Sequence, residues 1–573
     1  MSETLKTRRP TPTTDAIASA AYAVPGALAP CDLKLDSNEG RAPLVDVDAL
    51  SPLLLARYPK TLELEATLAE RHGLEPERVI VTAGADDALQ RLAAALLGPG
   101  RELVLPQPTF EMIERYAAAR GATLREVEWP GGPYPTEEVI AACTEATAMI
   151  AVVTPNNPTG AVATLEDLRR VAEAAPQAVV VLDHAYAEFA DEDLTLAALE
   201  LPNVVVLRTF SKAWGLAGLR VGFALGSAEV VGWLRAAGNP YPTAGPSLAV
   251  AGAALEGGEA ELALVVGRVD EEREVLRGTL AELGWQPLAS QANFVFARGG
   301  DSAWLRDALA GFGIAIRAFP GRARLENAVR ITCPGDAHDL QRLLHALRTT
   351  MQPEALLFDL DGVLADVSRS YRTAILETAA SFGVELTPAD ITAAKRAGDA
   401  NDDWSLTWSL LAARGVDARL EEVTERFEAL YQGTEEAPGL RANEGLLLSR
   451  ERLVELGRAL PLGIVTGRPR ADAERFLTER GVRDLFKVVI CREDAPLKPN
   501  PAPLRVALEA LGLERAWYLG DTVDDVRAAR SAGLLPLGVV APGEDAAPTR
   551  ETLGAAGAAR TLETTGALFA LLP

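Results

Sequence analysis

Short runs of β-branched and aliphatic residues alternate with longer helix-forming stretches along this chain, in two separate blocks. The first block ends near residue 350, and the second begins at ALLFDLDG (355–362). This alternation is typical of a parallel sheet covered by helices on both faces, because parallel neighbours need a crossover connection. The chain has 573 residues, and a single core stops growing near ~250–300 residues. We therefore expect two α/β domains, at residues 1–350 and 355–573.

The predicted strands are apolar and end next to polar or glycine-rich turns. In the first block they are VIVTAG (79–84), ELVLPQ (102–107), AMIAVVTP (148–155), AVVVLD (178–183), NVVVLRTF (203–210) and LRVGFAL (219–225). In the second they are ALLFDLDG (355–362), LGIVTG (462–467), FKVVI (486–490), AWYLGD (516–521) and LPLGVV (535–540). A helical stretch at about 370–445 separates the first two strands of the second block, and we expect it to form an inserted cap.

Charge and composition exclude several classes of protein. A formal net charge of −24 argues against nucleic acid and anionic membranes as partners, because both attract a positively charged face. The four cysteines are far apart and form no CxxC pair, which favours a reducing cytoplasm over a disulfide or zinc framework. No apolar run approaches the ~18 residues of a membrane span. We expect a cytoplasmic protein whose local arginines hold small anionic substrates.

The string TFSKAWGLAGLRVG (209–222) places one lysine beside several candidate phosphate ligands. Lys212 is suited to Schiff-base formation, and it follows Thr209 and Ser211, whose hydroxyl groups can donate to a phosphate. Arg220 lies further along the same string and can add a charge-assisted contact. The string predicts a lysine that binds a phosphorylated aldehyde cofactor.

Other strand ends supply candidate partners for the ring of that cofactor. Asp183 ends a predicted strand, where its carboxylate can hold a protonated pyridine nitrogen and make the ring an electron sink. Tyr186 and Asn157 are candidates to bond the phenolic oxygen, and Phe110 can stack on the ring. Backbone N–H groups of the turn TAGADDAL (82–89) can cradle a phosphate at a helix N-terminus. The predicted cofactor contacts are Ala85, Asp86, Phe110, Asn157, Asp183, Tyr186, Thr209, Ser211 and Arg220.

Together these strings resemble the fold-type I aminotransferases, and most closely the histidinol-phosphate aminotransferases, over about residues 20–348. The resemblance implies a mostly parallel sheet with a small C-terminal α/β subdomain, pyridoxal 5′-phosphate as cofactor, and an obligate homodimer. It extends to LDSNEG (35–40), RYP (57–59), PNNPTG (155–160), ANF (292–294) and VRIT (329–332).

The resemblance also assigns roles to individual residues. Tyr58 of RYP would reach the cofactor phosphate of the partner subunit, and Tyr22 would be a substrate-side tyrosine. Arg330 of VRIT would hold the substrate's carboxylate or phosphate, and Arg317 would be a second phosphate-contacting arginine. In the implied mechanism, Lys212 releases the cofactor to the amino donor, glutamate, and then acts as the general base at the substrate α-carbon.

Two positions depart from the family pattern. The family usually has NENP where this chain has Asn38-Glu39-Gly40-Arg41, and it often has DEAY where this chain has His184. These departures leave the keto substrate open, because related enzymes use the same cofactor on aromatic amino acids or decarboxylate threonine phosphate.

Four short motifs of the second block, each after a predicted strand, fit the transfer of a phosphoryl group. In FDLDGVL (358–364), Asp359 is the predicted nucleophile, and Asp361 would protonate the leaving oxygen and then activate water. Thr466 of VTGR and Lys498 of LKPNP would contact the phosphate and balance its charge. Carboxylate oxygens are preferred by Mg²⁺. The predicted Mg²⁺ ligands are Asp359, Asp361, Asp521 and Asp525.

These motifs resemble the haloacid dehalogenase superfamily over about residues 355–545, and the helical stretch resembles the cap of its first subfamily. Dehalogenases usually lack the second aspartate, so Asp361 favours phosphoryl transfer, by either a phosphatase or a sugar phosphomutase. Arg369 and Arg372 of the cap either reach the substrate or face solvent. The capless histidinol phosphatase of this superfamily has a different first motif, so the chain does not match that enzyme directly.

The sequence thus predicts a bifunctional enzyme, a histidinol-phosphate-type aminotransferase joined to a phosphatase. In histidine synthesis, transamination of imidazole-acetol phosphate gives histidinol phosphate, and the next step removes that phosphate, so the two halves could act consecutively. The alternatives are an aromatic or other amino-acid aminotransferase, or a lyase with the same cofactor, joined to an unrelated phosphatase. A further alternative, in which one half only binds or regulates, is disfavoured by the intact set of candidate catalytic residues.

Overall fold

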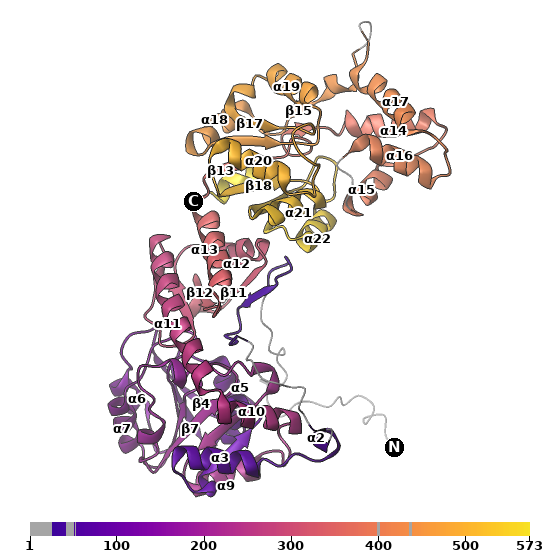
Figure 1. Cartoon of the computed structure of the whole chain (residues 1–573). Helices are drawn as coiled ribbons and strands as arrows, with labels where there is room; N and C mark the ends of the chain where they lie inside the picture. Colours follow the sequence, from indigo (N-terminus) through magenta and orange to yellow (C-terminus); the bar gives the residue numbers. More distant parts are fainter. Residues whose placement is uncertain (1–25, 42–50, 52, 398–401, 435–437, 573) are drawn as a thin grey trace, which may run out of the picture. The chain divides into compact units, whose positions relative to one another are not determined.

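The computed structural model describes residues 26–41, 51, 53–397, 402–434 and 438–572. The protein is α/β, as expected, and it divides into two compact units. Figure 1 labels the helices and strands of both units. Among the described residues, the first unit consists of 35–302 and 316–341, and the second of 26–34, 303–315 and 342–572.

A seven-stranded sheet forms the centre of the first unit, in the order β2-β8-β7-β6-β5-β3-β4. β8 runs antiparallel to both of its neighbours, and the other neighbouring pairs are parallel. The sheet is therefore mostly parallel, as the resemblance implies. Its strands are β2 (Val79–Thr82), β3 (Glu102–Gln107), β4 (Thr123–Glu128), β5 (Thr147–Val153), β6 (Val179–Asp183), β7 (Val204–Thr209) and β8 (Gly222–Leu225).

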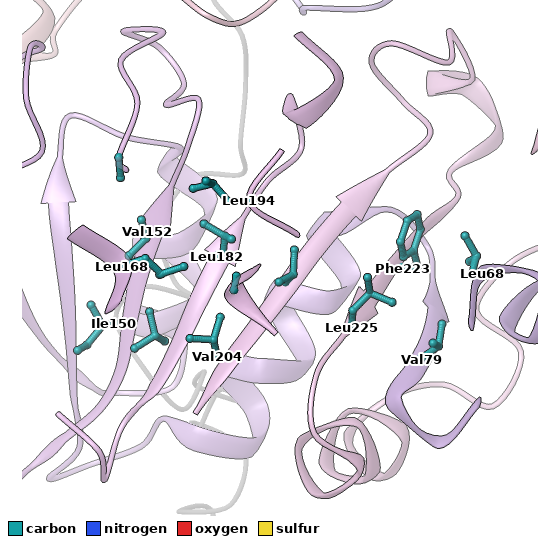
Figure 2. Close-up of a cluster of buried hydrophobic side chains, with 14 of the residues drawn as sticks. Leu68, Val79, Ile150, Val152, Leu168, Leu182, Leu194, Val204, Phe223 and Leu225 are labelled. Atoms are coloured by element: carbon teal, nitrogen blue, oxygen red, sulfur yellow. The ribbon is translucent and has the colours of Figure 1, made fainter. Parts of the chain in front are cut away.

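Side chains of the central strands alternate between two hydrophobic clusters, because successive residues of a strand point to opposite faces. Ile150 and Val152 of β5 belong to the cluster drawn in Figure 2, whereas Met149 and Ala151 belong to the other. Each fully buried aliphatic side chain contributes ~1.5–3 kcal/mol, so the strand ends are firmly positioned. The first cluster includes residues of α3 (Leu62–His72), α6 (Thr136–Ala142), α7 (Leu165–Ala174) and α10 (Gly245–Gly257), and the second of α4 (Ala85–Leu96), α5 (Glu111–Ala119) and α9 (Ala228–Ala237).

A five-stranded sheet follows in the order β1-β11-β12-β10-β9, and it corresponds to the expected small α/β subdomain. β12 pairs antiparallel with β10 and with β11, and this register places Arg317 directly beside Arg330. The strands are β1 (Leu33–Leu35), β9 (Gln286–Pro287), β10 (Phe294–Arg298), β11 (Ile314–Ala318) and β12 (Ala328–Thr332), and the helices of this region are α11 (Glu259–Glu282), α12 (Ser302–Gly311) and α13 (Ala337–Met351).

The second unit contains a six-stranded sheet in the order β17-β16-β13-β18-β19-β20, with parallel pairing throughout. Five of these strands lie where the sequence predicts them, and β20 lies in the alanine-rich tail. The strands are β13 (Ala355–Phe358), β16 (Leu462–Val465), β17 (Phe486–Ile490), β18 (Ala516–Gly520), β19 (Leu535–Val539) and β20 (Arg560–Leu562), and the helices are α18 (Arg450–Ala459), α19 (Arg470–Glu479), α20 (Ala502–Leu511), α21 (Val523–Ala532) and α22 (Ala546–Ala556).

A helical cap interrupts this unit between β13 and β16, as the sequence predicts. The chain enters the cap through β14 (Ala365–Asp366) and leaves it through β15 (Gly445–Leu446), and these two short strands pair with each other. The cap helices lie together in Figure 1, beside the sheet of this unit. They are α14 (Tyr371–Ser381), α15 (Pro388–Ala397), α16 (Asp403–Ala413) and α17 (Leu420–Gln432).

The second unit also takes in 26–34, 303–315 and 342–350, which the sequence division assigns to the first domain. Trp517 of β18 is fully buried, and its indole Nε1 donates to the carbonyl oxygen of Thr349 at 2.8 Å. The Trp304 ring packs edge-on against Trp517 at 5.6 Å between centroids. The Arg560 guanidinium stacks on Trp304 at 4.9 Å and pairs with Asp307 at 3.4 Å. These contacts explain why segments on both sides of residue 352 form one compact unit.

Within the described part of the chain, no helix has the length and apolar composition that crossing a membrane requires. All four cysteines belong to the described residues, and none of them forms a disulfide bond.

Candidate active sites

A cavity of about 460 Å³ lies at the carboxyl ends of β5, β6 and β7 in the first unit, the usual position for a ligand of a parallel sheet. Val153, Asp183 and Thr209, the last residues of these strands, all line it. The structure thus gathers residues that are distant in sequence. The predicted site residues that line the cavity are Ala85, Asp86, Phe110, Asn157, Asp183, Tyr186, Thr209, Ser211, Lys212, Arg220, Arg317 and Arg330.

Lys212 lies in the turn after β7, and its amine reaches into this cavity. Its Nζ donates to the carbonyl oxygen of Ser37 at 3.3 Å and lies 5.6 Å from the centroid of the Tyr186 ring. Burial lowers the pKa of Lys212 to about 8, and the positive charge of Arg330 acts in the same direction. A lysine with this pKa has a substantial neutral fraction near neutral pH, which a nucleophilic amine or a general base needs.

Asp183 is buried at the end of β6 with no cationic side chain bonded to it among the described residues. One carboxylate oxygen accepts a hydrogen bond from the backbone N–H of Ala185 at 3.3 Å. Burial, together with the nearby charge of Asp86, raises the pKa of Asp183 to about 7. A buried carboxyl in this state gains from a cationic N–H partner, and the nitrogen of a protonated pyridine ring fits this requirement.

Hydroxyl groups, a guanidinium and a helix N-terminus surround a second part of the cavity. Thr209 Oγ1 donates to Ser211 Oγ at 3.0 Å, and Arg220 Nη1 donates to the same Ser211 oxygen at 3.3 Å. α4 begins at Ala85, directly after Gly84, whose φ is +79°. A Cβ added to Gly84 would lie 2.7 Å from Arg220 Nη2. These donors and the close approach of backbone fit a phosphate group.

Arginines occupy the remaining side of the cavity. Arg330 Nη1 donates to the side-chain oxygen of Asn157 at 2.5 Å, and its Nη2 donates to the carbonyl oxygen of Asp36 at 2.6 Å. Arg317 is 9% exposed, and its Nη1 has no hydrogen-bond partner among the described residues. Its Nη2 lies 3.6 Å from a carboxylate oxygen of Glu111. A buried guanidinium with an N–H left over fits an anionic group of a substrate.

The sequence interpretation missed several residues here. Arg322 also lines the cavity and pairs with Glu111, but it lies in an irregular loop with no motif to indicate it. Asn38 has φ +53°, and its side-chain amide donates to the Tyr186 hydroxyl at 2.9 Å. Asn38 could have been found from the sequence, because it is a polar residue of the string LDSNEG in the loop that follows β1.

Two other positions of the sequence analysis, Tyr58 and His184, do not line this cavity. Tyr58 is 77% exposed and stacks on Tyr241 with 4.5 Å between ring centroids, so its side chain is accessible to another molecule. Tyr22 lies outside the described residues. His184 is buried, and its Nε2 accepts a hydrogen bond from the Leu194 backbone N–H at 3.2 Å, which indicates a structural role for this departure from the family pattern.

In the second unit, a buried lysine joins the aspartates at the carboxyl ends of the central strands. Lys498 Nζ donates to Asp359 at 2.8 Å, to Asp525 at 2.5 Å and to the Tyr518 hydroxyl at 2.8 Å. Burial alone would lower the pKa of Lys498, but the charges of Asp359 and Asp525 outweigh it and raise the pKa. Burial raises the pKa of Asp359, although Lys498 opposes that effect. The lysine therefore stays charged beside the predicted nucleophile.

Three carboxylates form a group that can hold a divalent cation. One oxygen from each of Asp359, Asp521 and Asp525 lies within 4.8 Å of the others. Burial and the charge of Asp525 raise the pKa of Asp521 to about 7, as expected where anionic groups crowd together. This hard oxygen donor set fits Mg²⁺. Asp361 lines the same pocket but is not part of this group of three, and its Oδ1 accepts a hydrogen bond from Arg468 Nε at 2.8 Å.

The pocket around these aspartates is lined by both the sheet and the cap. Arg372 lines it and pairs with Glu544 at 2.7 Å, whereas Arg369 is not part of its lining. Thr466 is buried beside the pocket, and its hydroxyl accepts a hydrogen bond from the backbone N–H of Arg468 at 3.1 Å. The sequence interpretation missed Lys395, a cap residue of the pocket that pairs with Asp403 at 3.3 Å.

Comparison with known families agrees with the geometry of the first cavity. The model of the aminotransferase class I and II family matches residues 46–347, which is more than half of the chain. The chain belongs to the class I and II aminotransferases. The model of the haloacid dehalogenase-like hydrolases matches residues 353–533. This aminotransferase therefore carries a hydrolase domain of that type in the same chain.

Curated relatives of this aminotransferase carry different substrate names. The chain is 36% identical over 309 residues to histidinol-phosphate aminotransferase of Paracoccus denitrificans, covering 52% of this chain and 83% of the relative. It is 39% identical over 308 residues to an aromatic amino acid aminotransferase of Mycobacteroides abscessus, covering 52% and 88%. Another relative is named imidazoleglycerol-phosphate dehydratase, from Phytophthora nicotianae, with 48% identity over 228 residues. That match covers 38% of this chain and only half of the relative.

Solved structures agree with the fold assignment. The crystal structure of histidinol-phosphate aminotransferase from Sinorhizobium meliloti, in complex with pyridoxal-5′-phosphate, superposes with a TM-score of 0.51 at 26% identity. The match covers 59% of this aminotransferase and 97% of that chain.

Proposed function

We propose that the first unit transfers an amino group from glutamate to a phosphorylated keto substrate with pyridoxal 5′-phosphate. The residues that would hold the phosphate are Thr209, Ser211, Arg220 and the first N–H groups of α4, while Asp183 would bond the ring nitrogen. When bound there, the cofactor accepts the amino group and withdraws electrons from the substrate α-carbon. Lys212 would carry the cofactor covalently and then move a proton at that carbon, as its pKa near 8 permits.

The observation that carries the substrate assignment is the pair of neighbouring arginines in this cavity. Arg317 and Arg330 face each other across β11 and β12, and Arg317 keeps a buried N–H without a partner among the described residues. Two neighbouring guanidinium groups suit a substrate with a phosphate at one end, and the same groups suit the carboxylate of the donor glutamate. The name histidinol-phosphate aminotransferase, carried by several relatives, fits such a substrate.

An aromatic amino acid is the second candidate substrate. Relatives with that name are as similar to the chain as those named for histidinol phosphate, and Phe110 and Phe319 line the cavity. The unpartnered N–H of Arg317 favours the phosphorylated substrate, because an aromatic side chain would leave that group unsatisfied.

We propose that the second unit hydrolyses a phosphate monoester. An Asp359 carboxylate oxygen attacks phosphorus, the ester P–O bond breaks, and the leaving oxygen takes a proton from Asp361. A water oxygen then attacks phosphorus while Asp361 takes one of its protons, the Asp359–phosphorus bond breaks, and inorganic phosphate leaves. Asp359, Asp521 and Asp525 would hold Mg²⁺, which supplies positive charge to the phosphoryl oxygens, and Lys498 would hold Asp359 in place.

The two reactions together would be consecutive. Transamination of imidazole-acetol phosphate gives histidinol phosphate, whose ester the second unit would then hydrolyse. The relative named for imidazoleglycerol phosphate supports a context of imidazole-bearing phosphates. We retain the division into residues 1–350 and 355–573 as the proposed limits of the two activities, and a cytoplasmic location as an expectation.

We further propose a homodimer in which the exposed Tyr58 reaches the cofactor phosphate of the other subunit. Leu53, Leu55 and Leu62, near Tyr58 in sequence, are also large exposed apolar side chains, which suits a surface covered by a second copy. Light scattering is expected to give a dimer. An active monomer at micromolar concentration would contradict this proposal.

Two single substitutions test the two activities separately. In Lys212→Ala, borohydride should no longer fix the cofactor to the protein by mass spectrometry, and transamination should fall at least ~10³-fold. Asp359→Asn should abolish Mg²⁺-dependent release of phosphate from histidinol phosphate, while transamination continues. If the wild type cleaves other phosphate esters but leaves histidinol phosphate intact, the consecutive reactions are excluded.

A further inference from the structure

Arg468 is a buried guanidinium that the proposed chemistry above does not use. It follows β16 in the VTGR motif and is 2% exposed. Its Nε donates to Asp361 Oδ1 at 2.8 Å, and its Nη2 donates to the same oxygen. The rings of Tyr371 and Phe476 lie 4.9 Å and 5.3 Å from its guanidinium carbon. Packing and hydrogen bonds thus fix this side chain against one oxygen of the predicted acid–base residue.

The other end of the same guanidinium bonds to the base of the cap. Arg468 Nη1 donates to Glu444 Oε2 at 2.9 Å and lies 3.4 Å from the Tyr431 hydroxyl. Glu444 directly precedes β15, and its Oε1 accepts hydrogen bonds from Ser370 at 2.8 Å and from Tyr431 at 3.1 Å. Ser370 directly precedes α14, the first helix of the cap. The network therefore includes both points at which the chain crosses between the sheet and the cap.

We propose that Arg468 is a positioning residue that orients Asp361 for proton transfer and makes this orientation depend on the seating of the cap. Both N–H groups end on Oδ1, so Oδ2 is the oxygen available to exchange a proton with the leaving group or with water. Movement of the cap base displaces Glu444 and Tyr431, and Arg468 moves with them. This inference rests on the proposed phosphatase reaction, in which Asp361 donates the proton.

Arg480 provides a matched control. Its Nη2 donates to the backbone oxygen of the same Glu444, and its guanidinium lies 5.9 Å from the Phe476 ring. None of the described contacts joins Arg480 to Asp361. Replacing either arginine by lysine keeps the charge and loses the forked geometry. Arg480→Lys removes a bond to the Glu444 backbone and leaves the bond between the Glu444 side chain and Arg468 in place, whereas Arg468→Lys alters the contact with Asp361 itself.

The experiment compares kcat/KM for 4-nitrophenyl phosphate and phenyl phosphate, with Mg²⁺, in the full-length chain. 4-Nitrophenolate is a weak base and leaves as the anion, whereas phenolate is more basic and leaves faster when an acid protonates its oxygen. In Arg468→Lys, kcat/KM for phenyl phosphate should fall about 10-fold more than for 4-nitrophenyl phosphate, within the ~10²–10⁴-fold range of acid–base catalysis. Arg480→Lys should leave the ratio between the two substrates at the wild-type value. Glu444→Gln should change it in the same direction as Arg468→Lys, by about 2- to 5-fold.

Equal losses on both substrates in Arg468→Lys would assign this arginine a merely structural role and overturn the proposal. An unchanged ratio in a folded Arg468→Lys protein would do so as well. If Arg468→Lys does not fold, as judged by its thermal transition, the ratio in Glu444→Gln decides. A wild-type protein that cleaves neither ester would instead refute the proposed phosphatase reaction.

Discussion

Two buried carboxyl groups show how the partner of a residue sets its chemistry. Asp359 accepts a hydrogen bond from Lys498 at 2.8 Å, so a cation is built into its surroundings. Asp183 has only a backbone N–H within bonding distance among the described groups, and its pKa rises to about 7. The protein itself thus supplies a cation beside Asp359, whereas Asp183 depends on a bound group for its counter-charge.

This difference predicts that the buried Asp183 carboxyl lowers the free energy of unfolding of the cofactor-free protein as the pH rises. The pKa of Asp183 is about 7 in the folded state and ~3.9 in an unfolded chain, so between these pH values the folded state binds more protons. The stability that this group contributes is therefore lost as pH rises from about 4 to about 7. In urea unfolding of the cofactor-free protein, Asp183→Asn should be more stable than wild type at pH 8, by up to ~4 kcal/mol. The two should converge near pH 4.

The exposed carboxyl of Glu200 serves as the control. The free energy of unfolding of Glu200→Gln, plotted against pH, should run parallel to that of wild type across the whole pH range. Parallel curves for Asp183→Asn and wild type would show that Asp183 ionises normally.

In the second unit, replacing the buried Lys498 should lower stability, whereas replacing Asp183 in the first unit should raise it. Lys498→Met leaves Asp359 and Asp525 buried without their cation, and breaking such a buried pair costs ~3–5 kcal/mol. Millimolar Mg²⁺ should recover part of this loss, because Asp359, Asp521 and Asp525 form one group of oxygens. Denaturant unfolding of the second unit, followed by phosphatase activity, measures both effects. Lys487→Met, at an exposed position of β17, should show neither.

At the scale of elements, the join between β2 and α4 positions the phosphate donors. Gly84 has φ +79°, and an added Cβ would meet Arg220 Nη2 at 2.7 Å. Gly222 on the neighbouring strand approaches the same turn, because its added Cβ would lie 2.6 Å from the Gly84 carbonyl carbon. Glycine is needed at this turn both for its backbone angle and for the space beside Arg220.

Gly84→Ala should therefore weaken cofactor binding at least ~10-fold, or ~1.4 kcal/mol, as measured by absorbance titration of the cofactor-free protein. Gly73→Ala is the matched control, since Gly73 ends α3 with φ +63° and its added Cβ would meet no atom within 4 Å. Both substitutions should lower the melting temperature, because both strain the backbone. Equal cofactor affinity in the two variants would show that Gly84 does not contribute to binding of the cofactor phosphate.

Sequence patterns predicted the central strands of the large sheets, which are buried on both sides, but not β10 and β12 of the small sheet, although these are buried as well. The apolar runs that became β5, β6 and β7 have every residue buried. β4 was missed because TLREVE is a largely exposed edge strand, and β14 and β15 because two residues carry no periodic signal. In the sites, most residues within the family-like strings were predicted, whereas Asn38, Arg322 and Lys395 were not. The roles of Arg322 and Lys395 depend on loops and cap helices whose tertiary placement no local pattern encodes.

At the scale of the whole molecule, family limits and compact units do not coincide. The aminotransferase match ends at residue 347, yet 303–315 and 342–351 belong to the same compact unit as the hydrolase fold. Trp304 and Trp517 meet in this unit, and both are buried. The hydrolase fold is therefore completed by residues that precede its own first strand.

Trp304→Ala should accordingly destabilise the phosphatase. Removing a buried tryptophan side chain costs ~3–5 kcal/mol, and this loss should appear as a shorter thermal half-life of phosphate-ester hydrolysis. Trp233→Ala is the control, because Trp233 is 39% exposed on α9 of the first unit. A Trp304→Ala protein as heat-stable as Trp233→Ala would mean that this packing contributes little.

The packing of Trp304 against Trp517 has an evolutionary consequence. A gene join that begins as a simple tether can be undone by a new stop and start codon between the two parts. Once an indole from one ancestral sequence has become core for the other, such a split leaves two products with exposed apolar surface. Selection then retains the joined gene whether or not the two reactions still benefit from proximity, and persistence of the fusion alone is no measure of metabolic coupling.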